Sequence, residues 1–483
     1  MPIRRRDFVK LLAAGAALGP HALARAARGM GMGGAGGATG GTLTVPVFQI
    51  PLPVPPELAP SGTVNGKPLY EIVQREADVE IIPGTTTRIW GYNGITPGPT
   101  LRVRRGDPVV VRQTNLLPDN VTTHLHGGHV PPQYDGYPVD YIVPGASKDY
   151  HYPNTQAGAM LWYHDHTMDL TGRHVWMGLA GLYIIEEPGE DTLGLPSGPY
   201  EVPLVIQDRN FAADGSLVYT DNIMQGELGS IILVNGAPWP YLEVGTRKYR
   251  LRILNGSNAR LYELALSNGA PFIQIGTDGG FLEQPVQRTR IRLAPAERVD
   301  VIVDFSSASV GDSIVLQNRA ATGAVSQIMR FDVTRAEADI GPVPQFLFPV
   351  ERLDPAAATS TRTFVFSMGG GMRTPWVING LPYDPNRIDA RPILGSTEIW
   401  ELVNRSGMFH PVHIHDIMWQ IVDVNGRPPA PGEAGWKDTF YVPPRGRVRV
   451  IGRFENYRGG PYVFHCHILE HEDHAMMAQF EVI

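Results

Sequence analysis

Residues 93–115 read NGITPGPTLRVRRGDPVVVRQTN, a stretch that is typical of the chain as a whole. Short runs of β-branched residues are separated by Gly, Pro and Asn, and comparable runs recur as KYRLRILNGSN, RVDVIVDF and RVRVIGRF. From residue 42 onward, no long segment repeats apolar residues at the helical spacing. The pattern predicts an all-β chain built of sandwiches or barrels.

The stretch at 93–115 has two counterparts, NGAPWPYLEVGTRKYRLRILN (235–255) and NGLPYDPNRIDARPILGSTEIWELVN (379–404). Each begins with an Asn-Gly turn, passes a proline and a glycine, and ends its strand with Asn. The turns start at 93, 235 and 379, so their spacings are 142 and 144 residues. This regularity predicts three copies of one β domain, at 42–190, 195–340 and 355–483, with Pro- and Gly-rich linkers at 186–199 and 341–358.

The N-terminus is typical of an export signal. Residues 1–27 combine a basic start, the apolar stretch LLAAGAALG and an A-x-A cleavage site. The sequence RRDFVK resembles the twin-arginine signal, so we expect the twin-arginine export machinery as a partner and a periplasmic or extracellular location. The apolar run is too short to span a bilayer, which predicts no stable membrane insertion. Residues 28–41, rich in Gly and Met, predict a flexible linker.

Charge and cysteine content narrow the possible partners. The formal net charge is −7 and the body of the chain has no basic run, which argues against nucleic acid or an anionic membrane surface as a partner. The single cysteine, Cys466, cannot form an internal disulfide, so the presence of a free thiol needs another explanation.

Ten of the fifteen histidines fall into four clusters: HLH at His124 and His126, HDH at His164 and His166, HPVHIH at His410, His413 and His415, and HCHILEH at His465, His467 and His471. The expected middle domain contains none, so a site built from them must join the first and third domains. We expect the remaining five to lie outside that site: His21, His129, His151, His174 and His474.

Strand geometry divides these residues between two sites. Successive side chains on a strand point to opposite faces, so the two imidazoles of an H-x-H motif share a face. In HCH, Cys466 must then point away from His465 and His467. The same alternation in HPVHIH puts His413 and His415 on one face and His410 on the side of the cysteine.

The ligand types indicate copper at both sites. A thiolate from Cys466, imidazoles from His410 and His471 and a weak thioether from Met476 are the ligands of a blue-copper electron-transfer centre. The other eight imidazoles suit a group of copper ions, since zinc rarely needs so many. An electron that reaches Cys466 can pass along the backbone to His465 or His467.

The four histidine clusters, in their order and spacing, resemble the multicopper oxidase family over most of the chain, and the motifs THLHGG, HPVHIH, GWKDT and HCHILEHEDHAMM add to this resemblance. They are most similar to those of the three-domain bacterial laccases, the group that includes spore-coat laccase, bilirubin oxidase and phenoxazinone synthase. The resemblance implies three cupredoxin-like Greek-key domains and four copper ions. It also implies O₂ as the electron acceptor, because four stored electrons reduce one O₂ to two waters.

The resemblance assigns twelve ligands. The type 1 copper would take His410, Cys466, His471 and Met476, although the adjacent Met477 is an alternative axial ligand. The type 2 copper would take His124 and His413. The type 3 pair would take His126, His164, His166, His415, His465 and His467.

Three residues are predicted to be catalytic. Cys466 would carry the electron, while Asp135 and Glu472 match acids that resembling oxidases use for proton delivery near the trinuclear cluster. Asp135 also has a structural explanation, because it precedes a glycine and can cap a turn.

Two enzymatic functions remain open. A laccase-type oxidase would take electrons from phenols or aromatic amines at the outer edge of His471. A metallo-oxidase would instead oxidise Cu(I) or another metal ion, but its relatives carry a methionine-rich insertion, whereas this chain has only Met368 and Met372 in SMGGGM, and Ser406 in place of a carboxylate. Non-enzymatic relatives with a role in export or cell division have lost copper ligands that are present here.

Overall fold

The computed structural model of the protein describes residues 45–369 and 371–483. Strands make up 46% of it and helices 7%, which confirms the predicted all-β class. Across these two ranges, no helix combines the length and apolar character needed to cross a membrane. The predicted export signal (1–27) and linker (28–41) lie outside the described residues.

The first group of strands forms a five-stranded sheet and a four-stranded sheet around one apolar core. The five-stranded sheet contains β1 (Gly62–Val64), β2 (Lys67–Val79), β3 (Thr87–Tyr92), β5 (Val109–Asn115) and β7 (Ser147–Tyr152). The four-stranded sheet contains β4 (Gly98–Arg104), β6 (Thr123–His126), β8 (Met160–Asp165) and β9 (Ala180–Glu186).

The second group forms an eight-stranded sheet and a five-stranded sheet around another core. The larger sheet contains β10 (Glu201–Phe211), β11 (Leu217–Val218), β12 (Ile231–Val234), β13 (Ala237–Pro238), β15 (Lys248–Asn255), β17 (Phe272–Thr277), β18 (Gly280–Arg288) and β20 (Arg298–Asp304). The smaller sheet contains β14 (Tyr241–Gly245), β16 (Tyr262–Leu266), β19 (Ile291–Leu293), β21 (Ser313–Asn318) and β22 (Gln327–Arg335).

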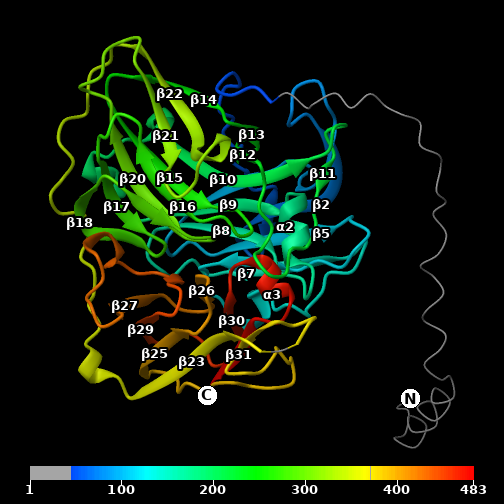
Figure 1. Ribbon diagram of the computed structural model, residues 1–483. Coiled ribbons are helices and arrows are strands. Elements are labelled where there is room, and N and C mark those ends of the chain that lie inside the picture. The colour runs from blue at the N-terminus through cyan, green and yellow to red at the C-terminus, as the bar shows by residue number, and fades with distance from the viewer. Residues whose placement is uncertain (1–44, 370) are drawn as a thin grey trace, which may run out of the picture. The chain divides into compact units, whose positions relative to one another are not determined.

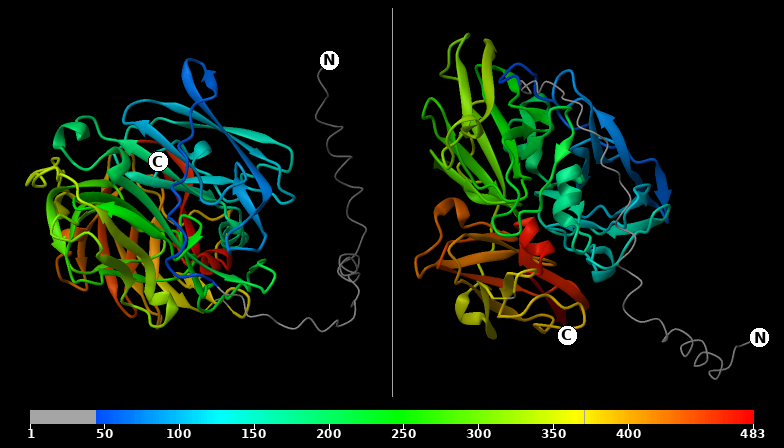
Figure 2. Two further views of the ribbon diagram at one scale, coloured as in Figure 1. Left: turned by 90° about the horizontal axis from the view of Figure 1, so that it is seen from above. Right: turned by 45° about the vertical axis from the view of Figure 1, so that its right-hand side comes forward.

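The third group has a five-stranded and a four-stranded sheet around a core that includes Cys466. The first contains β23 (Ser360–Met368), β24 (Trp376–Ile378), β25 (Thr397–Asn404), β27 (Trp419–Val424) and β29 (Arg447–Arg453). The second contains β26 (His410–Ile414), β28 (Thr439–Val442), β30 (Gly459–Cys466) and β31 (Met477–Val482). The three groups follow one another from blue and cyan, through green, to yellow, orange and red in Figures 1 and 2. The domain boundaries at 42–190, 195–340 and 355–483 remain a prediction.

The Asn-Gly turns have the same structure in all three groups. Both residues of each turn have positive φ, for example 56° at Asn93 and 74° at Gly94, as a type I′ turn requires. The side-chain oxygen of each turn Asn accepts a main-chain N–H from a preceding strand: Val73 for Asn93, Val205 for Asn235 and Val365 for Asn379. The repeat seen in the sequence is therefore a repeat of hydrogen bonds as well.

The Asn that ends each repeated stretch also makes equivalent hydrogen bonds in all three groups. Asn115, Asn255 and Asn404 each accept an N–H from the residue two positions later. Each also donates its amide group to two main-chain oxygens. These buried amides fix the end of β5, β15 and β25, the strand that pairs in parallel with β2, β10 and β23, respectively.

The helices are short. The α-helices are α2 (Thr171–Met177) and α3 (Leu469–Asp473), and the 3-10 helices are η1 (Pro132–Tyr134), η2 (Glu190–Leu193), η3 (Gly198–Tyr200), η4 (Ala324–Ser326), η5 (Pro355–Ala357) and η6 (Pro431–Glu433). Asp473 of α3 accepts the N–H groups of Thr171 and Gly172 at the start of α2, both at 2.8 Å. This contact joins the first and third groups beside the site described below.

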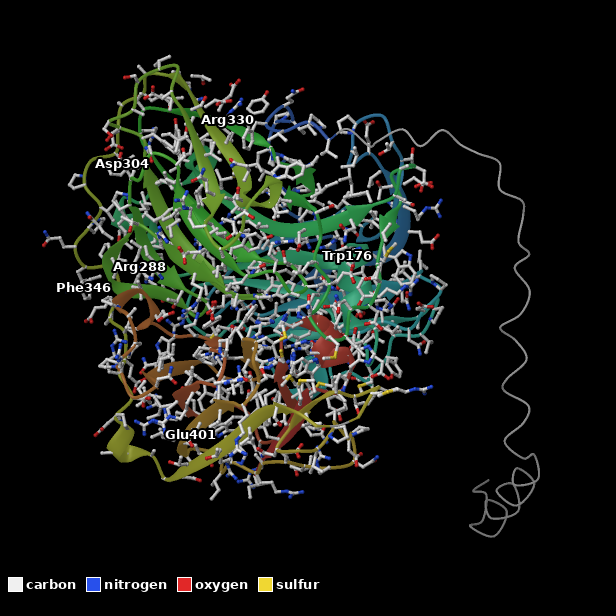
Figure 3. The ribbon with its side chains drawn as sticks, in the orientation of Figure 1. Trp176, Arg288, Asp304, Arg330, Phe346 and Glu401 are labelled. Atoms are coloured by element: carbon white, nitrogen blue, oxygen red, sulfur yellow. The ribbon has the colours of Figure 1, made fainter. Side chains whose placement is uncertain are left out.

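The middle group contacts α2 as well. Arg209 of β10 donates to the main-chain oxygens of Val175 and Trp176, both at 2.8 Å, and its guanidinium lies over the Trp176 ring. Figure 3 labels the buried Trp176 in the right-hand part of the described chain and Phe346 of the 341–358 linker, which is about half exposed, at the left edge.

Candidate metal centres

The four histidine motifs lie on two pairs of adjacent strands. In the first group, β6 and β8 are antiparallel and pair His124 with His164. In the third group, β26 and β30 are antiparallel and pair His413 with His465. Cross-strand pairing therefore brings the motifs together two by two.

Cys466 lies with His410 and His471, on the opposite side of its strand from its two sequence neighbours. Its Sγ is 3.3 Å from His410 Nδ1 and 3.6 Å from His471 Nδ1, and all three side chains are fully buried. The other imidazole nitrogen of His410 is bound to the Ser406 hydroxyl at 2.8 Å, which leaves Nδ1 directed at the sulfur. Ser406 thus orients a candidate ligand.

Met476 and Met477 point into different surroundings. Met476 belongs to the apolar core that contains Cys466, whereas Met477 packs with Tyr383 and Val463. The main-chain oxygen of Met476 also accepts the Cys466 N–H at 3.1 Å. Of the two methionines, Met476 is therefore the better candidate for an axial ligand.

His471 has no exposed edge, in contrast to the expectation from the sequence. The Trp376 ring lies 4.4 Å from it, centroid to centroid, and the main chain of Met224 approaches its imidazole. Trp376 Nε1 donates to the Ile223 oxygen at 2.8 Å, which holds the segment around Met224 in place. This segment comes from the second group of strands, so no local pattern around His471 predicts it.

The other eight imidazoles form a single buried cluster between the first and third groups, and most of them are oriented by their Nδ1 atoms. The acceptors are the main-chain oxygens of Asp135 for His124, Asp165 for His164, Asp438 for His413 and Cys466 for His465, and the Asp135 carboxylate for His415. His166 Nδ1 lies 3.3 Å from the Glu472 carboxylate. These contacts leave Nε2 of each ring free to face the centre of the cluster.

His126 has the reverse orientation. Its Nε2 lies 3.1 Å from Asp438 Oδ1 and 3.0 Å from the Thr439 hydroxyl, while its Nδ1 has no partner among the described residues. Nδ1 is therefore the nitrogen that His126 offers to the cluster. Asp438 lies in the GWKDT motif, yet it was not predicted as a site residue, because the sequence does not show which imidazole it contacts.

The cluster fits metal ions. Two nitrogens at about 2.0 Å from one tetrahedral ion lie roughly 3.3 Å apart. The Nε2 atoms of His124 and His413 are separated by 3.3 Å, those of His166 and His465 by 3.2 Å, and those of His415 and His465 by 3.4 Å. Within residues 45–369 and 371–483, several buried imidazole nitrogens lack any hydrogen-bond partner, including His164 Nε2 and both nitrogens of His467.

Protonation states agree with a role as ligands. Burial lowers the pKa of His164 to about 3 and holds the pKa of His124 and His413 well below the usual value, so these rings are neutral. Burial also raises the pKa of the Cys466 thiol. A bound cation would reverse that shift, since a coordinating thiol is deprotonated.

Comparisons with known proteins agree with this geometry. Models of the multicopper oxidase family match residues 74–190 and 355–483. The chain is 38% identical to a laccase of Bacillus subtilis, over 91% of this chain and 99% of the relative. The chain belongs to the multicopper oxidase family.

Two further similarities refine the class. A bilirubin oxidase of Albifimbria verrucaria is 36% identical, over 90% of this chain and 81% of its own. The crystal structure of a laccase from Pediococcus acidilactici superimposes with a TM-score of 0.85 at 36% identity, covering 91% of this chain and 95% of the other. The protein is thus a laccase-like, copper-dependent oxidase that uses O₂ and has a cupredoxin-like fold.

The two predicted acids of this multicopper oxidase are buried against the imidazole cluster. Asp135 accepts from His415 Nδ1 at 2.7 Å, and burial raises its pKa well above the usual value. Glu472 lies 3.1 Å from His465 Nδ1. Burial acts to raise the pKa of Glu472, but the neighbouring imidazoles of His166 and His465 outweigh burial and lower it.

Four of the five remaining histidines have other contacts. His174 binds the Asp165 carboxylate at 2.7 Å, His474 binds Asp221, His129 contacts Asn456, and His151 packs against Tyr134. His21 lies outside the described residues.

Proposed function

We propose that this multicopper oxidase removes electrons one at a time from phenols and aromatic amines near His471 and delivers them to O₂ at the imidazole cluster. The observation that carries this proposal is the division of one strand between two sites. Cys466 faces His410 and His471, while its direct neighbours His465 and His467 face the cluster. One peptide bond on either side of Cys466 therefore connects the two sites.

The proposed ligands are the twelve predicted from the sequence. His410, Cys466, His471 and Met476 would hold the type 1 copper, His124 and His413 the type 2 copper, and the other six imidazoles the type 3 pair. When bound, four copper ions would supply the four electrons that reduce one O₂ to two waters. The closely spaced Nε2 atoms of His124 and His413, at 3.3 Å, support their assignment to one ion.

Asp135 and Glu472 are proposed to handle the protons that O₂ reduction consumes. Each carboxylate lies against imidazoles of the cluster, and each is almost fully buried. A buried carboxylate hydrogen-bonded to a ligand's imidazole fixes the ring and can hold a proton within reach of the reacting atoms.

The reductant is proposed to contact the surface above His471 rather than the imidazole itself. Met224 is 43% exposed, and its main chain covers the ring. An aromatic donor needs no covalent bond to the protein, so electron transfer across one layer of residues is sufficient. A planar donor can pack against this partly apolar surface.

Oxidation of Cu(I) or another metal ion remains the second candidate. Met368 is opposite Trp376 in the β23–β24 pair, and it is 52% exposed, while Met372 is 93% exposed. Trp376, the cross-strand partner of Met368, packs against His471, and thioethers are soft ligands, which favours binding of Cu(I). The chain lacks a methionine-rich insertion, and Ser406 rather than a carboxylate stands four residues before His410, so we rank this function second.

One experiment separates these functions. Oxygen uptake by the copper-loaded protein is measured with 2,6-dimethoxyphenol and, separately, with Cu(I), together with the copper bound per chain. The proposal expects saturable phenol oxidation without added copper and four phenols oxidised per O₂. Phenol turnover that appears only with excess copper would favour the metallo-oxidase.

We also propose that residues 1–27 direct export by the twin-arginine route to the periplasm or the exterior. The support is the sequence around Arg5 and Arg6 alone. Replacing both arginines by lysine is expected to keep the protein in the cytoplasm, which cell fractionation measures. Normal export of that variant would rule out this route.

A further inference from the structure

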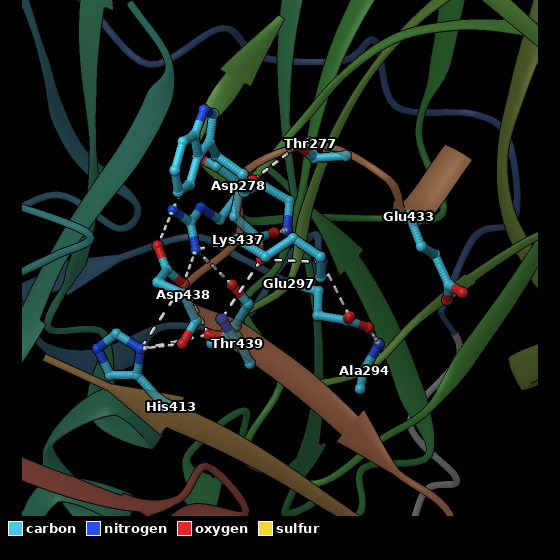
Figure 4. Close-up of polar contacts among 12 residues, drawn as sticks. Thr277, Asp278, Ala294, Glu297, His413, Glu433, Lys437, Asp438 and Thr439 are labelled. Atoms are coloured by element: carbon cyan, nitrogen blue, oxygen red, sulfur yellow. Dashed lines mark hydrogen bonds and ion pairs between the residues drawn. The ribbon is translucent and has the colours of Figure 1, made fainter. Parts of the chain in front are cut away.

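The second group of strands supplies no histidine, yet it reaches the imidazole cluster through charge. Asp278, Glu297 and Arg298 belong to this group and meet Lys437, Asp438 and Thr439 of the third group. All six side chains are at least nine-tenths buried. Figure 4 shows this network, with Asp278 and Lys437 beside Asp438, and His413 directly next to it.

Arg298 forms a bidentate ion pair with the Asp438 carboxylate. Nη1 donates to Oδ1 and Nη2 to Oδ2, each at 2.6 Å. The remaining donors of Arg298 are bound to the main-chain oxygens of Met160, Ala296 and Asp278. A planar guanidinium whose N–H groups all donate hydrogen bonds fixes the orientation of the carboxylate that it binds.

The neighbouring residues hold this pair in place. The N–H of Arg298 donates to Asp278 Oδ1 at 2.7 Å, and Asp278 Oδ2 lies 2.9 Å from Lys437 Nζ. Lys437 also pairs with Glu297 at 3.1 Å. Asp278 thus connects the strand that contains Arg298 to the segment that contains Lys437 and Asp438.

Asp438 contacts two rings of the cluster. Its Oδ1 is 3.1 Å from His126 Nε2, and its main-chain oxygen accepts from His413 Nδ1 at 2.9 Å. The two imidazoles are stacked, with ring centroids 3.6 Å apart. A shift of Asp438 would therefore disturb one ring directly and its stacked partner as well.

We propose that Arg298 is a positioning residue for the imidazole cluster: it fixes the Asp438 carboxylate, which keeps the proton of His126 on Nε2 and leaves Nδ1 free for copper. This inference rests on the proposed copper sites. The second group of strands would thereby control copper binding at a cluster to which it contributes no ligand, whereas the Cys466 site would be independent of Arg298.

The test is Arg298→Lys, with Arg250→Lys as the matched control. Lysine keeps the positive charge but cannot grip both carboxylate oxygens. Arg250 is an equally buried arginine of the same group that binds both oxygens of Asp300, at 2.9 and 2.5 Å, and within the described residues it has no hydrogen bond or ion pair with a histidine. Copper per chain, the blue thiolate absorption and thermal unfolding are measured on dialysed holoprotein.

We expect Arg298→Lys to weaken copper binding at the cluster by about 10- to 100-fold, as is typical for loss of a residue that orients a ligand. Blue absorption from the Cys466 site should stay, and excess copper should restore the lost ions. Arg250→Lys should retain full copper. Equal copper contents in both variants, with similar losses of thermal stability, would overturn the positioning role.

Two further results keep this inference separate from the proposed function. If Arg298→Lys is insoluble, Asp438→Asn replaces it, since the amide offers only one oxygen where Arg298 binds two; full copper in that variant would contradict the inference. Wild-type protein that binds copper only at Cys466 would overturn the proposed function itself, whereas a fully loaded wild type with an unaffected Arg298→Lys would overturn only the role of Arg298.

Discussion

The Cys466 site and the imidazole cluster share a strand but have opposite surroundings. Cys466 lies in an apolar core with Ile468 and Met476, and besides the imidazoles of His410 and His471 its sulfur contacts the main-chain N–H of Ile468, at 3.4 Å. The cluster, by contrast, is bordered by the carboxylates of Asp135, Asp438 and Glu472. A site that passes only electrons can exclude polar groups, whereas a site that consumes protons needs groups that hold them.

Removal of the thiolate should have the largest effect and should act on one site only. Cys466→Ser is expected to abolish the blue absorption and reduce oxidase turnover below detection, because a hydroxyl is a hard ligand that does not replace a thiolate. Copper at the imidazole cluster should be retained. Absorption and copper content are measured together, and survival of the blue band would contradict the assignment of Cys466.

Loss of a carboxylate beside the imidazole cluster should affect the cluster and not the Cys466 site. Glu472→Gln keeps the size of the side chain but removes its proton-binding carboxylate, so O₂ consumption should slow by about 10²-fold or more. The rate at which a phenol reduces the Cys466 site should be almost unchanged. This rate is measured without O₂ in a stopped-flow instrument, as loss of the blue colour. Equal slowing of both steps would mean that Glu472 acts on His471 instead.

Met476→Leu should change the properties of the Cys466 site without abolishing it. Loss of a weak thioether donor should raise the reduction potential while blue colour persists. Leucine fills nearly the same volume, so the free energy of unfolding should change by less than about 1.5 kcal/mol. Met477→Leu is the control, and a redox titration that finds the larger shift in Met477→Leu would reverse the assignment.

The smallest effect is expected outside both sites. Replacing Met368 and Met372 together by Leu should leave the rate of phenol oxidation within about twofold, since surface substitutions usually change free energies by no more than about 0.5 kcal/mol. Steady-state rates with 2,6-dimethoxyphenol and Cu(I) provide the measurement. Complete loss of saturable Cu(I) oxidation in this variant would favour the metallo-oxidase.

The sequence predicted the features that depend on neighbours along the chain. Alternation along a strand placed Cys466 away from His465 and His467, and the Asn-Gly turns predicted a threefold repeat whose hydrogen bonds the structure shows. These inferences succeed because side-chain direction on a strand has a fixed period.

Contacts between distant segments could not be predicted in this way. The cover of His471 comes from Met224, and Asp438 is fixed by Arg298, 140 residues away in sequence. Such contacts depend on how separate sheets pack, and neither Met224 nor Arg298 lies in a motif that marks it. The accessible edge expected for His471 was wrong for this reason.

The junction of α2 and α3, where Asp473 binds the start of α2, has a consequence for biosynthesis. His124 and His413 are separated by 289 residues, so at about 5–20 residues per second the first histidines leave the ribosome roughly 15–60 seconds before their partners. A nascent chain therefore carries half of the imidazole cluster and none of the thiolate site. Copper that arrives during this interval meets incomplete coordination, so delivery of the metal is best timed after the last residues of the chain have folded onto the first.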